Sequence, residues 1–167
     1  NDDGSRFVPV YEQISQVGID LQLTRDAWLW KFEALRREAE SGDFNAAVGG
    51  LEYTFYGVAD RAADLGVLIE YLYDDRSVAA PPTPFDDDVF IGARLALNDS
   101  SDTSVLAGAV IDTETHERFL NIEAERRFGD NLTLDLRLRA FSNAAPRSLL
   151  DGFAQDDYLQ LSLSWYY

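Results

Sequence analysis

Apolar and polar residues alternate along nearly the whole chain. Large apolar side chains recur at every second position in nine segments, at 16–24, 28–37, 51–55, 65–73, 91–98, 105–111, 120–127, 132–139 and 158–167. The clearest is 132–139, where four leucines alternate with Thr133, Asp135, Arg137 and Arg139. A period of two predicts a β-strand with one apolar and one polar face, because a helix would scatter the leucines around its axis. Segment 105–111 is apolar on both faces, so its phase stays open.

The strands and their connections together favour a membrane barrel. Several segments reach the nine or so residues that a tilted strand needs to cross a bilayer, and strands of globular proteins are usually shorter. Tight turns are expected at 24–26, 57–64, 98–103 and 129–131. Longer linkers alternate with them at 37–45, 74–88, 112–118 and 142–157. Short turns on one side and long loops on the other are typical of outer-membrane proteins. The sequence therefore predicts an all-β, antiparallel up-and-down transmembrane β-barrel.

Aromatic residues on the apolar faces fall near the two ends of the expected strands. Amphipathic rings are favoured where a bilayer meets water, so these residues are predicted to form membrane girdles. The predicted girdle at the short-turn edge contains Trp28, Trp30, Phe55, Phe128, Trp165 and Tyr167. The predicted girdle at the long-loop edge contains Tyr71 and Tyr73.

The last ten residues, "YLQLSLSWYY", are apolar at alternate positions and end on an aromatic residue. This ending resembles the C-terminal signal that the barrel-assembly machinery recognises, although that signal more often ends in Phe. The resemblance implies that the machinery reads Leu159, Leu161, Leu163, Trp165 and Tyr167. The stretches "DAWLWKFEALRR", "GGLEYTFYG", "EYLYDDR" and "QDDYLQL" also resemble a group of uncharacterised proteobacterial outer-membrane proteins. In that group these stretches lie in the C-terminal part of a longer chain, and the resemblance implies location and fold, not an activity.

Composition excludes several other classes of protein. The chain has 167 residues and no cysteine, which excludes disulfides and thiolate chemistry. No run approaches the roughly 18 apolar residues of a membrane-spanning helix. Acidic residues outnumber basic ones by 30 to 14, so nucleic acid is not an expected partner. We expect one domain over residues 1–167 in the outer membrane, without a cofactor or metal site, in contact with lipid and lipopolysaccharide.

The polar face of the predicted barrel would line its lumen. The lumen-lining acids are Asp20, Glu33, Glu52, Glu70, Glu123, Glu125 and Asp135. The lumen-lining bases are Lys31, Arg37, Arg94, Arg127, Arg137 and Arg139. Nearly balanced charges indicate either structural pairing or a polar path for a small solute, with Arg137 and Arg139 facing Glu123 and Glu125. Most of the net charge of −16 falls in the turns and loops, where acidic groups form a solvated surface or bind divalent cations.

These observations predict a non-enzymatic barrel that acts as a narrow channel, a conduit for solute or lipid, or a structural scaffold. One alternative is an outer-membrane lipid hydrolase that uses His116, the single histidine, as a base beside a serine such as Ser148. The other alternative is a soluble lipocalin-like barrel. Such a barrel also alternates, but its apolar face points inward.

The number of strands raises a question about the first residues. Nine strands break the even count of bacterial single-chain barrels, and they start the first strand on the external side. Residues 6–13 could form a tenth strand, but Pro9 would interrupt its ladder. We therefore expect residues 1–167 to be the C-terminal portion of a larger, even-stranded barrel, with residues 1–15 as an external loop remnant. An N-terminal barrel segment or another envelope protein would then be a partner.

Overall fold

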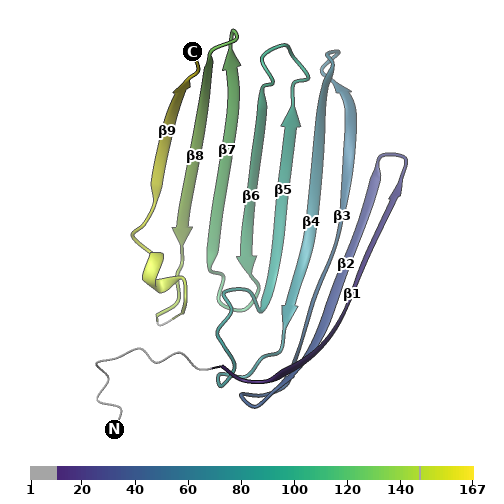
Figure 1. The fold of residues 1–167 in the computed structure, drawn as a ribbon, viewed down its shortest axis with the longest axis vertical. Helices are drawn as coiled ribbons and strands as arrows, with labels where there is room; N and C mark the ends of the chain where they lie inside the picture. Colours follow the sequence, from purple (N-terminus) through teal and green to yellow (C-terminus); the bar gives the residue numbers. More distant parts are fainter. Residues whose placement is uncertain (1–10, 147) are drawn as a thin grey trace.

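One antiparallel sheet of nine strands accounts for the chain in the computed structural model, which describes residues 11–146 and 148–167 (Figure 1). Each strand pairs with its neighbours in sequence, so the prediction of an all-β up-and-down fold is confirmed. The strands are β1 (Ile14–Arg25), β2 (Trp28–Ala39), β3 (Phe44–Val58), β4 (Ala63–Asp74), β5 (Asp87–Ala96), β6 (Ser104–Asp112), β7 (Arg118–Phe128), β8 (Leu132–Ser142) and β9 (Tyr158–Trp165). A single 3-10 turn, η1 (Asp151–Phe153), precedes β9.

The sheet is open. Among the described residues β1 pairs only with β2 and β9 pairs only with β8, so the closure expected of a barrel is not found. Figure 1 shows the sheet bending, with β1 and β2 inclined to the strands of the other half. No helix in the described part of the chain is long and apolar enough to cross a membrane.

Three boundaries differ from the sequence-based expectation. Strand β3 begins at Phe44, well before the predicted 51–55, because small residues such as Ala47 and Gly49 hide the alternation while their backbones still pair with β2 and β4. The expected long linker at 37–45 therefore shortens to residues 40–43, and two loops, 75–86 and 143–157, account for most of the long-loop edge. Strand β1 begins at Ile14, so 14–15 are not loop. Residues 11–13 precede the strand, as the remnant predicts, and residues 1–10, which include most of the possible tenth strand, lie outside the described residues.

The strand registers settle the phase of β6, which the sequence left open. Leu106 pairs with Arg94 of β5 and with Glu123 of β7, so Leu106 and Gly108 lie on the polar face. Val105 pairs with Leu95, which places Val105 on the apolar face.

The two faces of the sheet are exposed in the opposite way to those of a globular protein. In the central strand β4, Ile69 and Tyr71 on the apolar face are each 45% exposed, whereas the side chain of Glu70 between them is 22% exposed. Side chains on the polar face also reach partners two strands away, at 3.4 Å for Lys31–Glu70 and 3.1 Å for Arg94–Glu52, which fits the inner side of the bent sheet. The concave face is therefore polar and crowded, and the convex face is apolar and open.

The turn between β5 and β6 is built around Asp99. Its carboxylate accepts hydrogen bonds from the backbone amide and the hydroxyl of Thr103, both at 2.9 Å, and from the amide of Ser101 at 3.2 Å. Arg126 lies 3.5 Å from the same carboxylate. The bond from the Thr103 amide is the main reason that the pKa of Asp99 lies below its usual range.

We expect this turn to be sensitive to acid. A carboxylate with a lowered pKa in the folded state stabilises the fold fully above the ordinary aspartate pKa, and this stability is lost as pH falls through the lowered value. In urea titrations from neutral pH to about pH 2, the Asp99→Asn variant should lose less stability on acidification than the parent chain. Asp130→Asn, in the exposed turn between β7 and β8, is the control and should follow the parent. Equal acid sensitivity in the Asp99→Asn variant and the parent would contradict this assignment.

Candidate functional site

The thirteen charged residues that the sequence assigned to the lumen lie on one face of the sheet. The registers connect them in rows that cross the strands: Asp20 lies opposite Glu33, and Arg94 is joined through Leu106 to Glu123 and then Arg137. The same reading places on this concave face Lys31, Glu52, Glu70, Glu125, Arg127, Asp135 and Arg139, together with Arg37. The candidate site is therefore the concave face, built by every strand from β1 to β8.

Two ion pairs on this face each span a whole strand. Lys31 Nζ of β2 lies 3.4 Å from Glu70 Oε1 of β4, with Gly50 of β3 between them in the register. One step along, Arg94 Nη2 of β5 lies 3.1 Å from Glu52 Oε1 of β3, with β4 between them. Because each pair skips a strand, it links three neighbouring strands and supports the curvature of the sheet.

Glycine makes room for both pairs. A Cβ atom at Gly50 would lie 2.4 Å from Glu70 Cγ and 2.5 Å from the Ile69 carbonyl oxygen. A Cβ atom at Gly66 of β4 would lie 2.8 Å from Glu52 Oε1. A side chain at either position would occupy the space that the ion pair now crosses. The two ion pairs therefore explain why glycine occupies these two positions of the polar face.

The other half of the concave face is less paired than the sequence predicted. Glu123 lies opposite Arg137 in the register, but no ion pair within 4.0 Å joins them in the described residues. Asp135 lies opposite Glu125, and Arg139 lies opposite Asn121, to which its Nε donates a hydrogen bond of 3.3 Å. Arg137 therefore faces Glu123 as expected, although no ion pair joins them, whereas the expectation that Arg139 faces Glu125 is wrong.

Arg127 and Arg126 form ion pairs with the β5–β6 turn instead of with the centre of the concave face. Arg127 Nη2 lies 3.1 Å from Asp102 Oδ2, and Arg126 reaches Asp99 as described above. These contacts fasten β7 to the tight-turn edge. Arg127 therefore acts at the rim of the predicted lumen.

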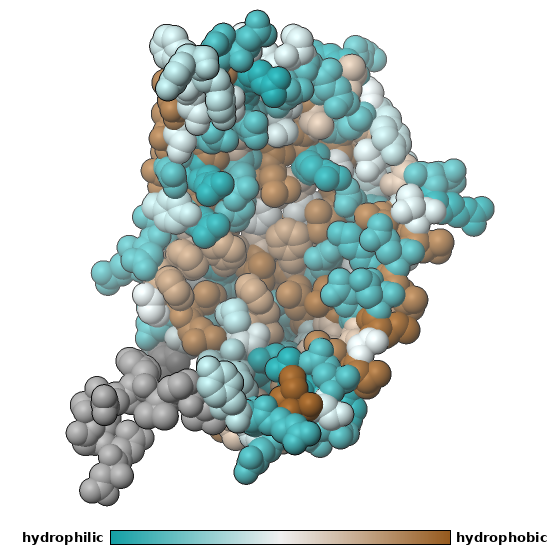
Figure 2. All heavy atoms as spheres, in the orientation of Figure 1, coloured by the Kyte–Doolittle hydropathy of each residue, from teal (hydrophilic) through white to brown (hydrophobic). Residues whose placement is uncertain are grey.

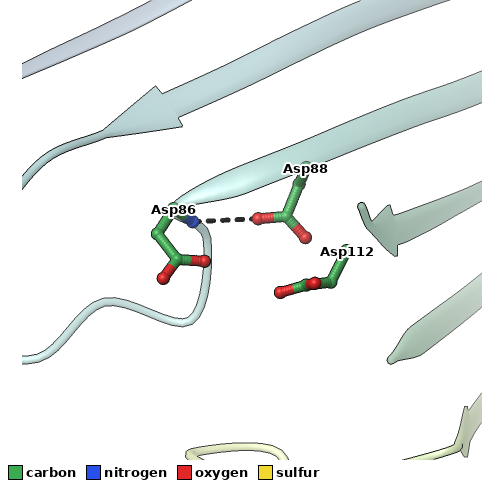
Figure 3. A group of neighbouring side chains, drawn as sticks. All are labelled: Asp86, Asp88 and Asp112. Carbon is green, nitrogen blue, oxygen red and sulfur yellow. Dashed lines mark hydrogen bonds between the residues drawn. The ribbon is translucent and has the colours of Figure 1, made fainter. Parts of the chain in front are cut away.

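A cluster of three aspartates, Asp86, Asp88 and Asp112, lies at the long-loop end of β5 and β6 (Figure 3). One carboxylate oxygen from each lies within 4.8 Å of the others, the arrangement of oxygen ligands that hard cations such as Ca²⁺ take. Asp88 is 2% exposed and accepts the Asp86 amide at 2.9 Å, while Asp112 accepts the Glu114 amide at 2.8 Å. The carboxylates thus already order the ends of the two strands. The sequence analysis named no metal site, although it noted that acidic groups of the loops could bind divalent cations.

His116 and Ser148, the two residues of the hydrolase alternative, have different hydrogen-bond partners. His116 is exposed in the β6–β7 turn with a positive φ of 62°, and its carbonyl accepts a bond from the Asn143 side chain. The hydroxyl of Ser148 donates to the carboxylate of Glu117. No hydrogen bond joins the His116 imidazole to a serine hydroxyl within residues 11–146 and 148–167.

The predicted girdle residues at the tight-turn edge meet on the convex face. Trp28 lies 6.0 Å from Trp30 and 4.6 Å from Tyr53, and Tyr53 lies 4.7 Å from Phe55, measured between ring centroids. Tyr53, which was not among the predicted girdle residues, completes this cluster. Phe128 and Trp165 are exposed at the same edge, and Tyr71 and Tyr73 are exposed toward the other. Strand β9 ends at Trp165, so Tyr167 lies beyond the strand in which it was expected.

Comparisons of this chain with protein-family models, with curated proteins and with solved structures find no match. The resemblance to outer-membrane proteins therefore remains a prediction. It rests on the residues of this chain alone.

The glycine that the first ion pair crosses provides a stability test. Gly50→Ala should lower the free energy of unfolding by about 1–3 kcal/mol, because the new Cβ would overlap backbone as well as side-chain atoms. Its neighbour is a matched control, since a Cβ at Gly49 would meet only Phe32 at an ordinary 3.6 Å. Gly49→Ala should change stability by less than about 0.5 kcal/mol. Equal costs in urea unfolding would show that the crowding at Gly50 is absent.

A double-mutant cycle tests the second ion pair. Glu52→Gln and Arg94→Gln should show a coupling free energy of about 1 kcal/mol, a modest value because the Arg94 side chain is 64% exposed. Arg137→Gln, on the same face without an ion pair, should cost less than about 0.5 kcal/mol. A vanishing coupling, or an Arg137→Gln cost equal to that of Arg94→Gln, would contradict the pairing seen here.

Proposed function

We propose that this chain forms part of a non-enzymatic outer-membrane β-barrel whose concave face lines a narrow polar lumen. One observation carries the proposal: the burial of the chain is inverted. Leu159, Leu161 and Leu163 are each 66% exposed, whereas Glu52 and Asp88 are 8% and 2% exposed. Such an apolar surface is costly in water and is favourable against lipid hydrocarbon.

The concave face supports a narrow lumen better than a wide pore. Its acids and bases are similar in number, and two of its ion pairs cross strands and draw side chains into the space inside the curve. A wide ion-selective pore would show an excess of one charge. The proposed role is therefore a constricted channel, a conduit for a small solute or lipid, or a scaffold.

The open edges support a larger barrel. Strands β1 and β9 are separated by seven antiparallel neighbours, so they run in the same direction. Pairing them directly would form one parallel seam, whereas an all-antiparallel closure needs an odd number of further strands between them. We propose that an N-terminal barrel segment or another envelope protein supplies these strands, because an open edge in lipid leaves backbone groups unpaired.

The proposed partners follow from the same surfaces. The convex face would contact membrane lipid, and the acidic long-loop edge would face lipopolysaccharide. The barrel-assembly machinery would recognise the alternating apolar residues of β9. A soluble lipocalin-like barrel is disfavoured because its apolar face would be the concave one. A hydrolase is disfavoured because His116 and Ser148 have different hydrogen-bond partners.

Two neighbouring positions in β9 distinguish a lipid-facing surface from a lumen. Leu161→Arg, on the convex face, should destabilise the vesicle-folded protein by about 2–4 kcal/mol in the free energy of unfolding, because the guanidinium would lie in hydrocarbon. Ser162→Arg, on the concave face, should cost less than about 1 kcal/mol. Urea titration of vesicle-folded protein measures both values. Equal costs, or a larger cost at Ser162, would contradict the proposal.

Function as a conduit is tested by conductance of the full chain in planar bilayers, once the face that meets water has been identified. Because the chain has no cysteine, single cysteines can be introduced at positions 161 and 162. A membrane-impermeant thiol reagent should label only the cysteine at position 162. Discrete conductance steps would support a channel. A folded, correctly labelled protein without conductance would reduce the proposal to a scaffold.

A further inference from the structure

We propose that a hollow at the long-loop end of the concave face binds a small amphiphile that has an aromatic or aliphatic body and one anionic group. The hollow is separate from the two strand-spanning ion pairs and from the aspartate cluster. The inference goes beyond the proposed function and does not depend on how the barrel closes, because the described residues form the hollow by themselves.

Aromatic residues replace polar ones on the concave face at this end of the sheet. Phe119 of β7 lies directly opposite Phe141 of β8, and their rings stack with centroids 5.1 Å apart. Phe153 of η1 extends the stack, with its ring 5.9 Å from that of Phe141 and nearly parallel to it at 25°. On the face shown in Figure 2, brown residues gather where the lower ends of β7 and β8 meet η1. Three rings in sequence offer a surface for a flat apolar group.

The stack lines a hollow of about 340 Å³. Pro84 and Phe85 of the loop before β5 and Leu150 of the loop before η1 also line it. This volume is within the range of small-molecule sites, and the walls are almost entirely apolar.

A cation lies at the margin of this apolar hollow. Arg139 lines it and is half-buried, with its guanidinium 5.9 Å from the Tyr158 ring and its Nε bonded to the neutral Asn121. No carboxylate lies within 4.0 Å of Arg139 in the described part of the chain, although the chain carries 30 acidic residues. An arginine without an anionic partner beside an apolar wall matches a ligand with one carboxylate or similar group.

Arg76 shows how this chain builds an arginine–aromatic contact that is only structural. Its guanidinium lies 4.3 Å from the Phe44 ring and holds Asp74 through two bonds, of 2.7 and 2.6 Å. That cation is neutralised, and Phe44 is 3% exposed. At the hollow the cation has no such partner, and Phe153 is 51% exposed.

The loop that carries η1 is held in place before any ligand binds. Buried Glu117 accepts the Ala145 amide at 2.6 Å and the hydroxyl of Ser148, so the loop is tied to the turn between β6 and β7. At the other end of the loop, Asp157 accepts the Phe141 amide at 2.7 Å. A preformed wall avoids much of the ordering cost of binding.

Binding of 2-naphthoate to the full chain in detergent tests the proposal, with the neutral 2-naphthalenemethanol as the matched ligand and protein-free micelles as the background. Saturation-transfer NMR and calorimetry should show saturable binding of 2-naphthoate about ten-fold tighter than that of the alcohol. Arg139→Gln should remove this preference and leave the alcohol unaffected. Phe153→Ala, in the exposed η1, should weaken both ligands.

Arg137→Gln is the control, because Arg137 is a cation on the same strand and face but lies outside the hollow. This variant should bind like the parent. Binding no stronger than the micelle background, equal affinity for the two ligands, or an equal loss in Arg137→Gln and Arg139→Gln would each overturn the proposal.

Discussion

The antiparallel ladder is the constraint on which the other features depend. In a strand every second side chain must point to the same face, and the registers extend this rule across all nine strands. Once the sheet curves with its charged face inside, the long apolar side chains have to splay on the outside. The strand-spanning pairs Lys31–Glu70 and Glu52–Arg94 fit only on that inner side. The choice of inner face therefore determines both the charged interior and the apolar exterior.

Alternation was enough to predict where most strands lie, their up-and-down order and the shared face of the thirteen charged residues assigned to the lumen. The leucines of β8 and β9 are unambiguous because they alternate strictly with polar residues. Small side chains obscure the alternation, and Ala47 and Gly49 concealed the first half of β3. The run from Val105 to Ile111 is apolar on both faces, so its inward-facing residues became clear only from the strand partners of β6. Backbone pairing decides such segments, and it depends on residues distant in sequence.

Contacts within the concave face could be predicted less well than the face itself. Position parity and the register both place Glu123 opposite Arg137, yet no ion pair within 4.0 Å joins these two described residues. The ion pairs Lys31–Glu70 and Arg94–Glu52 join residues 39 and 42 positions apart in sequence. Each depends on the space left by a glycine, which local sequence patterns do not reveal. Phe119 and Phe141 occupy positions of polar parity, so they were not recognised as a stack. Only the register brings them opposite each other.

The two ends of the concave face differ in chemistry, and this difference limits what the face can accept. A fully hydrated ion would lose water against the phenylalanine rings of the hollow beside β7 and β8, and this desolvation is unfavourable. A wholly apolar molecule would be retained by the rings and opposed by the buried charges of Glu52 and its neighbours. An amphiphile with one anionic group meets both demands, because its apolar body matches the rings while its charge can approach Arg139, which lines the same hollow. The order of apolar wall, unpaired arginine and charged row along one face thus favours such a molecule over either extreme.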